Sequence, residues 1–422
     1  IPIRIITEHV NALKNNVFVR NTVGLTIFNA VGGVVVLFTN VKLANTLGAA
    51  VFGLYSYYMA IGEVGQNFVR YGRNKTMIRD LVQFPHKSHS LISNTLGLSI
   101  INILIFLTVI ILFSGTLEVE ISIASILLII SPCLMSIDLT PVYESLKLMS
   151  WHSIYNLIQK FIFLIGIWGV IIIFGKVNLL HLGIILFISW LYIVLIQCHE
   201  VIKSLNINIA KCISISQIWD LYKGNFIIAL SCMIGVAFGP LIRIILNQYV
   251  SETAVGIYSA GLQIFLMSNF IISQIGRVGN PLMAELGKPN VTVEKKKKFL
   301  KKYLLIMLIG ALPFVVPLLF FSSAITNAFF TEEYMELALY LPYFAIYILA
   351  LAIGIVYTQF LLSIRKDKAY FIIYTLGAAL TVVSGLVLIP TYGVLGGVLS
   401  LCLPHSVACI AYCVTSLKYL RK

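Results

Sequence analysis

The stretch MELALYLPYFAIYILALAIGIVYTQFLLSIRKDK, residues 335–368, decides the fold class of this chain. Residues 335–362 form an apolar run that exceeds the roughly 20 residues a helix needs to cross ~30 Å of hydrocarbon. A basic turn with Arg365, Lys366 and Lys368 follows it directly. An apolar run that ends in cationic residues is typical of a transmembrane helix whose basic end lies in the cytoplasm.

The same pattern recurs outward from this stretch along the whole chain. Apolar runs give twelve candidate spans, at about 18–41, 48–70, 91–113, 119–141, 152–174, 179–199, 224–246, 254–277, 302–323, 335–362, 369–389 and 394–417. The chain is 59% hydrophobic and 11% charged, and its mean hydropathy is +0.97. The sequence therefore predicts an all-α polytopic membrane protein with twelve transmembrane helices.

The basic residues predict the orientation of these spans. Of the 30 Lys and Arg residues, all but Lys42, Lys176 and Arg243 fall on one side when the spans alternate across the membrane. The opposite loops carry acidic residues, namely Glu118, Glu120, Glu252, Glu332, Glu333 and Glu336. The positive-inside rule then predicts that both termini are cytoplasmic.

Composition and motifs exclude several function classes. The net charge of +14 follows from short cytoplasmic loops, so we expect no nucleic-acid partner. The longest loops are roughly 20 residues, too short for a soluble catalytic domain. No nucleotide-binding loop and no HExxH motif occur, and the seven cysteines form no CxxC pair. We predict no catalytic residues, no metal and no cofactor. Residues 1–16 are polar and mixed, so no cleavable signal peptide is expected.

An internal repeat appears when the sequence is shifted by 203 residues. Phe52-Gly53-Leu54-Tyr55-Ser56 then aligns with Val255-Gly256-Ile257-Tyr258-Ser259, and each stretch opens a span. Six spans per half keep the same orientation, so we expect parallel repeats related by an axis along the membrane normal. The predicted halves are two six-helix lobes, residues 1–210 and 211–422. A generic Gly-x-Tyr turn at the membrane interface is the simpler explanation of the match.

Three stretches together resemble the O-antigen type of bacterial polysaccharide flippase, which shares a superfamily with lipid II flippases and multidrug-and-toxin-extrusion transporters. The stretches are Leu47-Gly48-Ala49-Ala50-Val51-Phe52-Gly53-Leu54-Tyr55-Ser56 with its second-half counterpart, Leu361-Leu362-Ser363-Ile364-Arg365-Lys366-Asp367-Lys368, and Leu388-Ile389-Pro390-Thr391-Tyr392-Gly393-Val394-Leu395-Gly396-Gly397. Val398 departs mildly from the family pattern, and many relatives have fourteen spans.

This resemblance implies a transporter rather than an enzyme. The expected activity is transfer of an undecaprenyl-diphosphate-linked oligosaccharide, the O-antigen repeat unit of lipopolysaccharide biosynthesis, from the cytoplasmic to the periplasmic leaflet by alternating access. The expected location is the bacterial inner membrane. Expected partners are the lipid-linked oligosaccharide, membrane lipids, a polysaccharide polymerase and a chain-length regulator. The family's cavity-lining helices correspond to spans 1, 2, 7 and 8.

Helical periodicity independently finds polar faces on the same four spans. The candidate substrate-cavity residues on them are Asn29, Asn40, Glu63, Gln66, Arg70, Arg243, Asn247, Asn269 and Arg277. Polar side chains are costly in lipid, so these faces should point at protein or at water. A water-filled cleft between lobes would satisfy them, and so would hydrogen bonds in a dry helix bundle.

Glu63 and Arg243 are the most informative single candidates. Glu63 lies well inside span 2, where it would couple transport to an ion, close a gate, or form a static ion pair. Arg243 suits a phosphate or an acidic sugar, although snorkelling to the outer interface explains it equally well. Arg70 and Arg277 would capture a diphosphate at the cytoplasmic mouth, or would only set the topology.

Three other functions compete with the flippase prediction when only the sequence is considered. A multidrug antiporter of the same fold should have an acidic cavity, whereas the charged candidates here are mostly basic. A lipid II flippase is compatible with every feature above. A membrane-bound glycan ligase or polymerase needs a large exoplasmic loop, and no loop on that side exceeds roughly 16 residues.

Overall fold

The chain folds into helices joined by turns. The computed structural model describes residues 14–137, 139–146, 148–286 and 291–421, with side chains described from Val31 onward apart from a few positions. In that part of the chain there is no strand, and ten helices are long and apolar enough to cross a membrane. The prediction of an all-α polytopic membrane protein is confirmed.

Two helices are long enough for two crossings each. Helix α2 (Lys14–Arg70) has 57 residues and α16 (Asp367–Arg421) has 55, which at ~1.5 Å per residue exceeds twice the ~30 Å hydrocarbon thickness. Each bends at one glycine with non-helical dihedrals: Gly48 with φ 75° and ψ 168°, and Gly393 with φ 55° and ψ −126°. Gly48 is the first residue of the predicted span 48–70, and Gly393 lies between the predicted spans 369–389 and 394–417. The total of twelve crossings stays a prediction.

The helices group into two compact units. Unit 1 takes in the chain up to Val36 and Tyr58–Val236, whereas unit 2 takes in Leu37–Tyr57 and the chain from Ala237 onward. The middle of α2, residues 37–57, therefore packs with the second half of the sequence. The predicted division at residue 210 assigns these residues to the first lobe. The predicted lobes, residues 1–210 and 211–422, stay a prediction.

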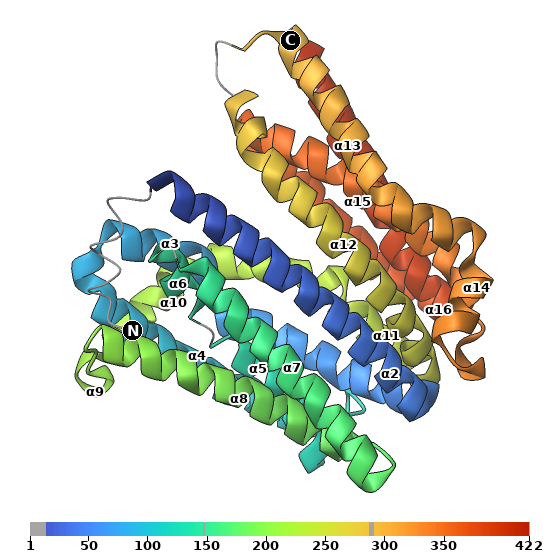
Figure 1. Cartoon of the computed structure of the whole chain (residues 1–422), viewed down its shortest axis with the longest axis horizontal. Helices are drawn as coiled ribbons and strands as arrows, with labels where there is room; N and C mark the ends of the chain where they lie inside the picture. Colours follow the sequence, from blue (N-terminus) through green and yellow to red (C-terminus); the bar gives the residue numbers. More distant parts are fainter. Residues whose placement is uncertain (1–13, 138, 147, 287–290, 422) are drawn as a thin grey trace. The chain divides into compact units, whose positions relative to one another are not determined.

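Unit 1 is a bundle built around the second half of α2. Its other elements are α3 (Arg73–Gln83), η1 (Pro85–Lys87), α4 (Ser88–Leu112), α5 (Ile123–Met135), α6 (Thr140–Ser145), α7 (Met149–Phe174), α8 (Leu179–Ser204), α9 (Ile209–Cys212) and α10 (Ile215–Ile234). Helix α8 packs against α5 and α7, and α4 packs against α9 and α10 (Figure 1). Gly62 and Gly65 of α2 let it approach α5, because neither presents a Cβ to that neighbour.

Unit 2 is organised around α15 (Leu337–Ser363). Its other elements are η2 (Gly235–Phe238), α11 (Pro240–Tyr249), α12 (Glu252–Leu286), α13 (Val293–Phe320), α14 (Ser322–Phe329), η3 (Glu332–Tyr334) and α16. Helix α15 contacts α12, α13, α14 and α16, and it is the central helix of this unit (Figure 1). The predicted span 7 is broken between α10 and α11, where Gly239 precedes Pro240, the first residue of α11. A proline at that position loses no hydrogen bond.

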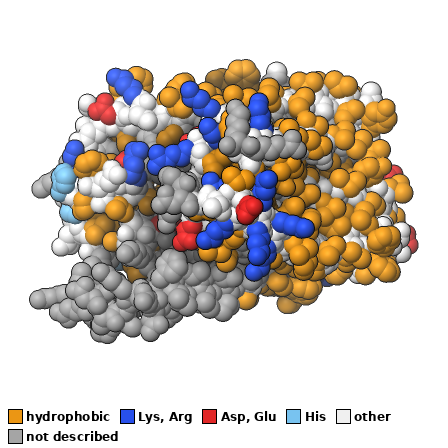
Figure 2. All heavy atoms as spheres, turned by 90° about the horizontal axis from the view of Figure 1, so that it is seen from above, with side chains coloured by type: hydrophobic (Ala, Val, Ile, Leu, Met, Phe, Trp, Pro, Cys, Tyr) orange, Lys and Arg blue, Asp and Glu red, His pale blue; other side chains and the backbone are white. Residues whose placement is uncertain are grey.

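The surface matches a membrane environment. Many large apolar side chains are exposed on the crossing helices, for example Leu112 at 73%, Ile172 at 78% and Phe320 at 74%. Such a surface would aggregate in water, whereas lipid tails cover it at little cost. Figure 2 shows Lys and Arg side chains gathered on one part of the surface beside a broad hydrophobic part.

Candidate functional site

The predicted site residues divide between the two units. Glu63, Gln66 and Arg70 belong to unit 1, and Asn40, Arg243, Asn247, Asn269 and Arg277 belong to unit 2. The side chain of Asn29 lies outside the described residues. Each group is therefore considered within its own unit.

In unit 2, Asn40 and Arg243 hold segment 37–57 against α11 and α12. The Asn40 amide Nδ2 donates to Oε1 of Gln263 at 2.8 Å. Arg243 is 7% exposed, and its Nη1 donates to the Ser56 carbonyl oxygen at 3.4 Å. Shifting Asn40 by 203 residues gives Arg243, so each of these two repeat positions makes a hydrogen bond within unit 2. Arg243 is buried in protein, and its hydrogen bond to Ser56 connects α11 to segment 37–57.

The remaining unit 2 candidates differ in exposure. Asn269 is half-buried, and Arg277 is exposed. Asn247 is half-buried, and its Oδ1 has no hydrogen-bond partner among the described residues although no solvent reaches that atom. A buried oxygen of this kind indicates an internal water or a ligand group.

The two glycines of the repeated motif contact one another. A Cβ added to Gly53 would lie 1.8 Å from the Glu252 carbonyl oxygen, and one added to Gly256 would lie 2.0 Å from the Ala49 carbonyl oxygen. Positions 49 and 252 also differ by 203, so the contact is nearly symmetric. Backbones approach this closely only where both residues lack a side chain. The motif that revealed the repeat therefore forms a tight helix crossing within unit 2.

The bend of α2 is fastened by a carboxylate from η3. Glu333 Oε2 accepts a hydrogen bond from the Ala49 N–H at 2.6 Å, at the first residue after the bend. A carboxylate at a helix start satisfies a free N–H and opposes the positive end of the helix dipole. A Cβ at Gly48 would lie 2.8 Å from the same Oε2, and the dihedrals of Gly48 already disfavour any other residue.

Three further hydrogen bonds surround this carboxylate. Asn45 Nδ2 donates to the Phe329 carbonyl at 2.8 Å, and its Oδ1 accepts from the Thr331 N–H at 3.2 Å. The hydroxyl of Tyr334 donates to the Ala44 carbonyl at 3.1 Å. Burial and the neighbouring Glu333 raise the pKa of Tyr334, so its hydroxyl remains a donor. We call Asn45, Gly48, Thr331, Glu333 and Tyr334 the Glu333 clamp.

In unit 1, Glu63, Gln66 and Arg70 lie on the second half of α2. Glu63 and Arg70 are half-buried, and the backbone carbonyl of each accepts a hydrogen bond from a nearby side chain. The Glu63 carbonyl accepts from Nδ2 of Asn67 at 2.9 Å, and the Arg70 carbonyl accepts from Nε of Arg73 at 3.2 Å. Nε2 of Gln66 is buried without a hydrogen-bond partner among the described residues.

Arg73 is a polar centre that the sequence did not reveal. It belongs to the basic loop that sets the topology, yet it is only 3% exposed. Its guanidinium donates to the Thr95 carbonyl at 2.9 Å and to the Ser99 hydroxyl at 2.6 Å. Nearby, Thr76 donates to the Asn225 side chain at 2.7 Å, which joins α3 to α10. Burial of one arginine in a basic loop leaves no signature in the sequence.

Lys160 and His405 are ionisable residues that lie well inside their helices. Lys160 lies inside α7, and its Nζ would be 2.7 Å from a Cβ at Gly32. His405 lies inside α16 and hydrogen-bonds Tyr347. Ionisable groups at such depth are functional candidates by default.

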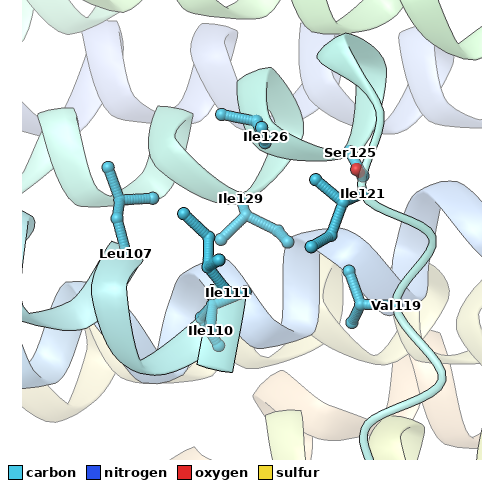
Figure 3. A pocket seen from close by; sticks show the side chains of 8 residues that line it. All are labelled: Leu107, Ile110, Ile111, Val119, Ile121, Ser125, Ile126 and Ile129. Atoms are coloured by element: carbon cyan, nitrogen blue, oxygen red, sulfur yellow. The ribbon is translucent and has the colours of Figure 1, made fainter. Parts of the chain in front are cut away.

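A small apolar cavity lies in unit 1 between the end of α4 and the start of α5. Figure 3 shows its lining, which includes Leu107, Ile111, Ile121 and Ile129 with Ser125 at one side. Its volume of about 60 Å³ is well below the ~150 Å³ that admits benzene, so no sugar fits. Among the described residues, no group of three or more His, Cys, Asp and Glu side chains could hold a metal ion.

Comparison with known families gives one match. The sequence profile described as "Polysaccharide biosynthesis protein" matches residues 18–287. No curated protein sequence matches the chain significantly.

Several solved structures share the fold. The lipid II flippase MurJ in an inward closed conformation has 15% identity and a TM-score of 0.74, with 93% of this chain and 87% of that chain covered. An inward-facing multidrug resistance MATE family transporter of the MOP superfamily has 13% identity and a TM-score of 0.70, with 94% of both chains covered. The Vibrio cholerae MATE transporter VcmN has 14% identity and a TM-score of 0.64, with 95% and 97% covered.

Proposed function

This chain belongs to the polysaccharide biosynthesis protein family, and from that premise we propose that it flips an undecaprenyl-diphosphate-linked oligosaccharide, an O-antigen repeat unit, across the bacterial inner membrane. It is a membrane transporter of the fold shared by MurJ and the MATE proteins. No bond is made or broken in this activity. The task is to shelter a polar glycan from ~30 Å of hydrocarbon while its lipid tail stays in the membrane.

The observation that carries the proposal is the coincidence of family and fold. The family profile covers most of the chain, and the fold is that of a protein whose printed name is lipid II flippase. The lengths of the connections between helices support it, because the turns in the described part of the chain are too short to hold a catalytic domain.

We propose specific roles for the candidate residues on this basis. Arg70 and Arg277 would meet the diphosphate at the cytoplasmic ends of their helices, where a guanidinium can bind two oxygens at once. Glu63 would couple transport to an ion or close a gate. Asn29, Gln66, Asn247 and Asn269 would offer hydrogen bonds to the glycan. Asn40 and Arg243 would fasten the outer end of the transporter while substrate enters from inside.

The proposed setting follows from the same premise. Both termini would be cytoplasmic, with residues 1–210 and 211–422 as two lobes that alternate around a central cleft. A polysaccharide polymerase and a chain-length regulator would use the flipped product.

Two other functions fit the fold; the charge of the candidate residues disfavours the first, and the effect of losing the gene distinguishes the second. A multidrug antiporter binds cations, whereas the charged candidates Arg70, Arg243 and Arg277 outnumber Glu63. A lipid II flippase would carry a related lipid diphosphate. Its loss would stop growth, whereas loss of an O-antigen flippase would change only the cell surface.

The test is the leaflet location of the lipid-linked oligosaccharide in cells with and without the gene. Intact spheroplasts are probed with a lectin or glycosidase that cannot cross the membrane. We expect the glycan to be accessible only when the gene is present, and to accumulate inside without it. An unchanged leaflet distribution, together with gene-dependent efflux of cationic dyes, would replace the proposal with the antiporter.

A further inference from the structure

The start of α13 carries six lysines within eight residues. They are Lys295, Lys296, Lys297, Lys298, Lys301 and Lys302. The only carboxylate in this helix is Glu294. All of the lysines except the half-buried Lys296 are exposed, and none of the six forms an ion pair with a described residue. The positive-inside rule accounts for the side of the membrane on which they lie, but it does not require them to gather on one helix end.

This helix end is electrostatically unfavourable without an added anion. The start of a helix is the positive end of its dipole, so cations there are disfavoured. Like charges three or four residues apart on a helix also repel each other. Lys298 has three such neighbours, at positions 295, 301 and 302. An anionic ligand along this end of α13 would offset both repulsions.

The lysines share a face of α13 with side chains that contact lipid. Steps of three or four residues place side chains on one row of a helix. One such row runs through Lys298, Lys302, Leu305, Ile309, Leu312 and Val316. The four apolar members of this row are exposed by 40% to 57%, whereas Leu300, Tyr303 and Met307 on the opposite side are buried. A lipid whose tails cover the row therefore has its headgroup beside the lysines.

The length of α13 places these lysines at the level of the headgroups. The helix has 28 residues, about 42 Å at ~1.5 Å per residue, whereas the hydrocarbon is ~30 Å thick. Counting back the roughly 20 residues that cross hydrocarbon from Phe320, the last residue of the helix, reaches Lys301. The two turns before Lys301 therefore extend through the layer in which lipid phosphates lie.

Contacts within unit 2 show at which end of the unit the lysines lie. The hydroxyl of Tyr303 donates to Oε1 of Gln359 at 2.9 Å, which joins the start of α13 to the last part of α15. Helix α15 ends at Ser363, directly before the basic turn with Arg365 and Lys366. The start of α13 also lies at the same end of unit 2 as the end of α16 (Figure 1). This is the end that the positive-inside rule predicts to be cytoplasmic.

We propose that the exposed lysines at the start of α13 bind the phosphate headgroups of anionic phospholipids in the cytoplasmic leaflet. Each ammonium group donates to phosphate oxygens as a compact point charge. A lysine beside an anionic membrane surface strengthens the attraction about fivefold. The row and its depth favour the phospholipids that surround the protein as the source of the phosphate. This binding is separate from the transported molecule and does not depend on the proposed function.

Quenching of tryptophan fluorescence by brominated lipids measures this preference in the full-length chain. The four tryptophans, Trp151, Trp168, Trp190 and Trp219, all belong to unit 1, so phenylalanine replaces them and a single reporter is introduced into α13. Leu305→Trp places the reporter one turn inside Lys302. Val316→Trp is the matched control, because it lies on the same row, eleven residues further along and in the opposite leaflet.

The bilayers contain phosphatidylglycerol and phosphatidylcholine, with either lipid brominated. We expect phosphatidylglycerol to be favoured at Leu305→Trp by about fivefold or more, and both lipids to bind equally at Val316→Trp. Salt at about 1 M, where the Debye length is ~3 Å, should abolish the preference, and a preference that salt does not reduce would contradict a headgroup site.

Removal of charge separates this site from a generally basic surface. Replacing Lys298, Lys301 and Lys302 with glutamine should lower the preference at Leu305→Trp to the value at Val316→Trp. The matched variant removes the same charge from three exposed lysines of unit 1 by Lys87→Gln, Lys203→Gln and Lys223→Gln, and it should keep the preference.

Two results would overturn the proposal. The first is an equal lipid preference at Leu305→Trp and Val316→Trp, a comparison that stands even if the glutamine variant does not fold. The second is an unchanged preference when Lys298, Lys301 and Lys302 are replaced. If the Leu305→Trp reporter shows no lipid preference but responds to millimolar inorganic pyrophosphate, the lysines bind a diphosphate group instead of membrane phospholipid.

Discussion

The Gly53–Gly256 crossing gives a prediction whose size follows from the geometry. In Gly53→Ala the new Cβ would lie 1.8 Å from the Glu252 carbonyl oxygen, whereas ordinary contact begins at 3.4 Å. The helices must therefore separate by roughly 1.6 Å at this point. The obstacle is backbone on both sides, so no rotamer change relieves it.

The energetic cost has two parts. Overpacking of this kind costs ~1–3 kcal/mol. Separation also stretches the neighbouring bonds of segment 37–57, such as Asn40 to Gln263, and losing one costs ~1 kcal/mol. A total of ~2–4 kcal/mol lowers the ratio of docked to undocked segment by about 30- to 900-fold.

The assay is chemical cross-linking across the Glu333 clamp. Cysteines replace Asn45 and Thr331, which are joined by a 3.2 Å hydrogen bond, in a chain whose seven native cysteines have been substituted. A short bifunctional maleimide then reports how often the segment is docked. Gly354→Ala in α15 is the matched control, because a Cβ there meets nothing within 4 Å.

We expect Gly53→Ala to reduce the cross-linking rate strongly and to impair leaflet transfer, while Gly354→Ala changes neither. Wild-type cross-linking in Gly53→Ala would mean that the helix crossing tolerates separation and that the repeated motif does not control docking. Loss of folded protein would be visible as an aggregated elution profile, and Gly256→Ala then repeats the test from the opposite helix.

Three further outcomes are expected. Arg73→Ala should destabilise the protein by ~1–3 kcal/mol, because the buried Thr95 and Ser99 oxygens lose their donor. Arg79→Ala, at a side chain 60% exposed, should stay within ~0.5 kcal/mol, and equal melting temperatures of the two variants would contradict this. Gly48→Ala should cost ~1–3 kcal/mol through its dihedrals and lower the melting temperature, whereas an unchanged value would show that the bend relaxes freely. Glu63→Gln should weaken the gradient dependence of transport; full transport with wild-type gradient dependence would exclude Glu63 from coupling.

The Glu333 clamp and Arg243 hold the same piece of chain. The clamp fastens segment 37–57 at the bend of α2, and Arg243 holds the same segment at Ser56.

Much of the architecture was predictable because the membrane imposes simple rules. Every backbone polar group in hydrocarbon must be bonded internally, so an apolar run of span length is a helix. The bend at Gly48 lies at the start of a predicted span and the one at Gly393 lies between two predicted spans, and both glycines belong to stretches that marked the family. The broken span 7 was not predicted, since the apolar run continues through Gly239 and Pro240 without a change in hydropathy.

Several candidate residues had environments that periodicity could not supply. Arg243 stays a predicted substrate residue, and the structure adds that it is buried and donates to the Ser56 carbonyl, a contact that periodicity does not reveal. His405 has a hydrogen-bond partner, Tyr347, that comes from a helix 58 residues earlier in the chain. Periodicity identifies a face of one helix, but it does not say which helix covers that face.

The amino-acid sequence by itself determined the helical membrane class, and it predicts a repeat of 203 residues and polar faces on four spans. These depend on transfer free energies and on helix geometry, both of which are local properties of the chain. Only the tertiary structure decided that segment 37–57 packs with the second half, that Glu333 caps the helix after Gly48, and that His405 meets Tyr347. Those outcomes depend on which helices pack together, and that choice is made by close packing between residues distant in sequence.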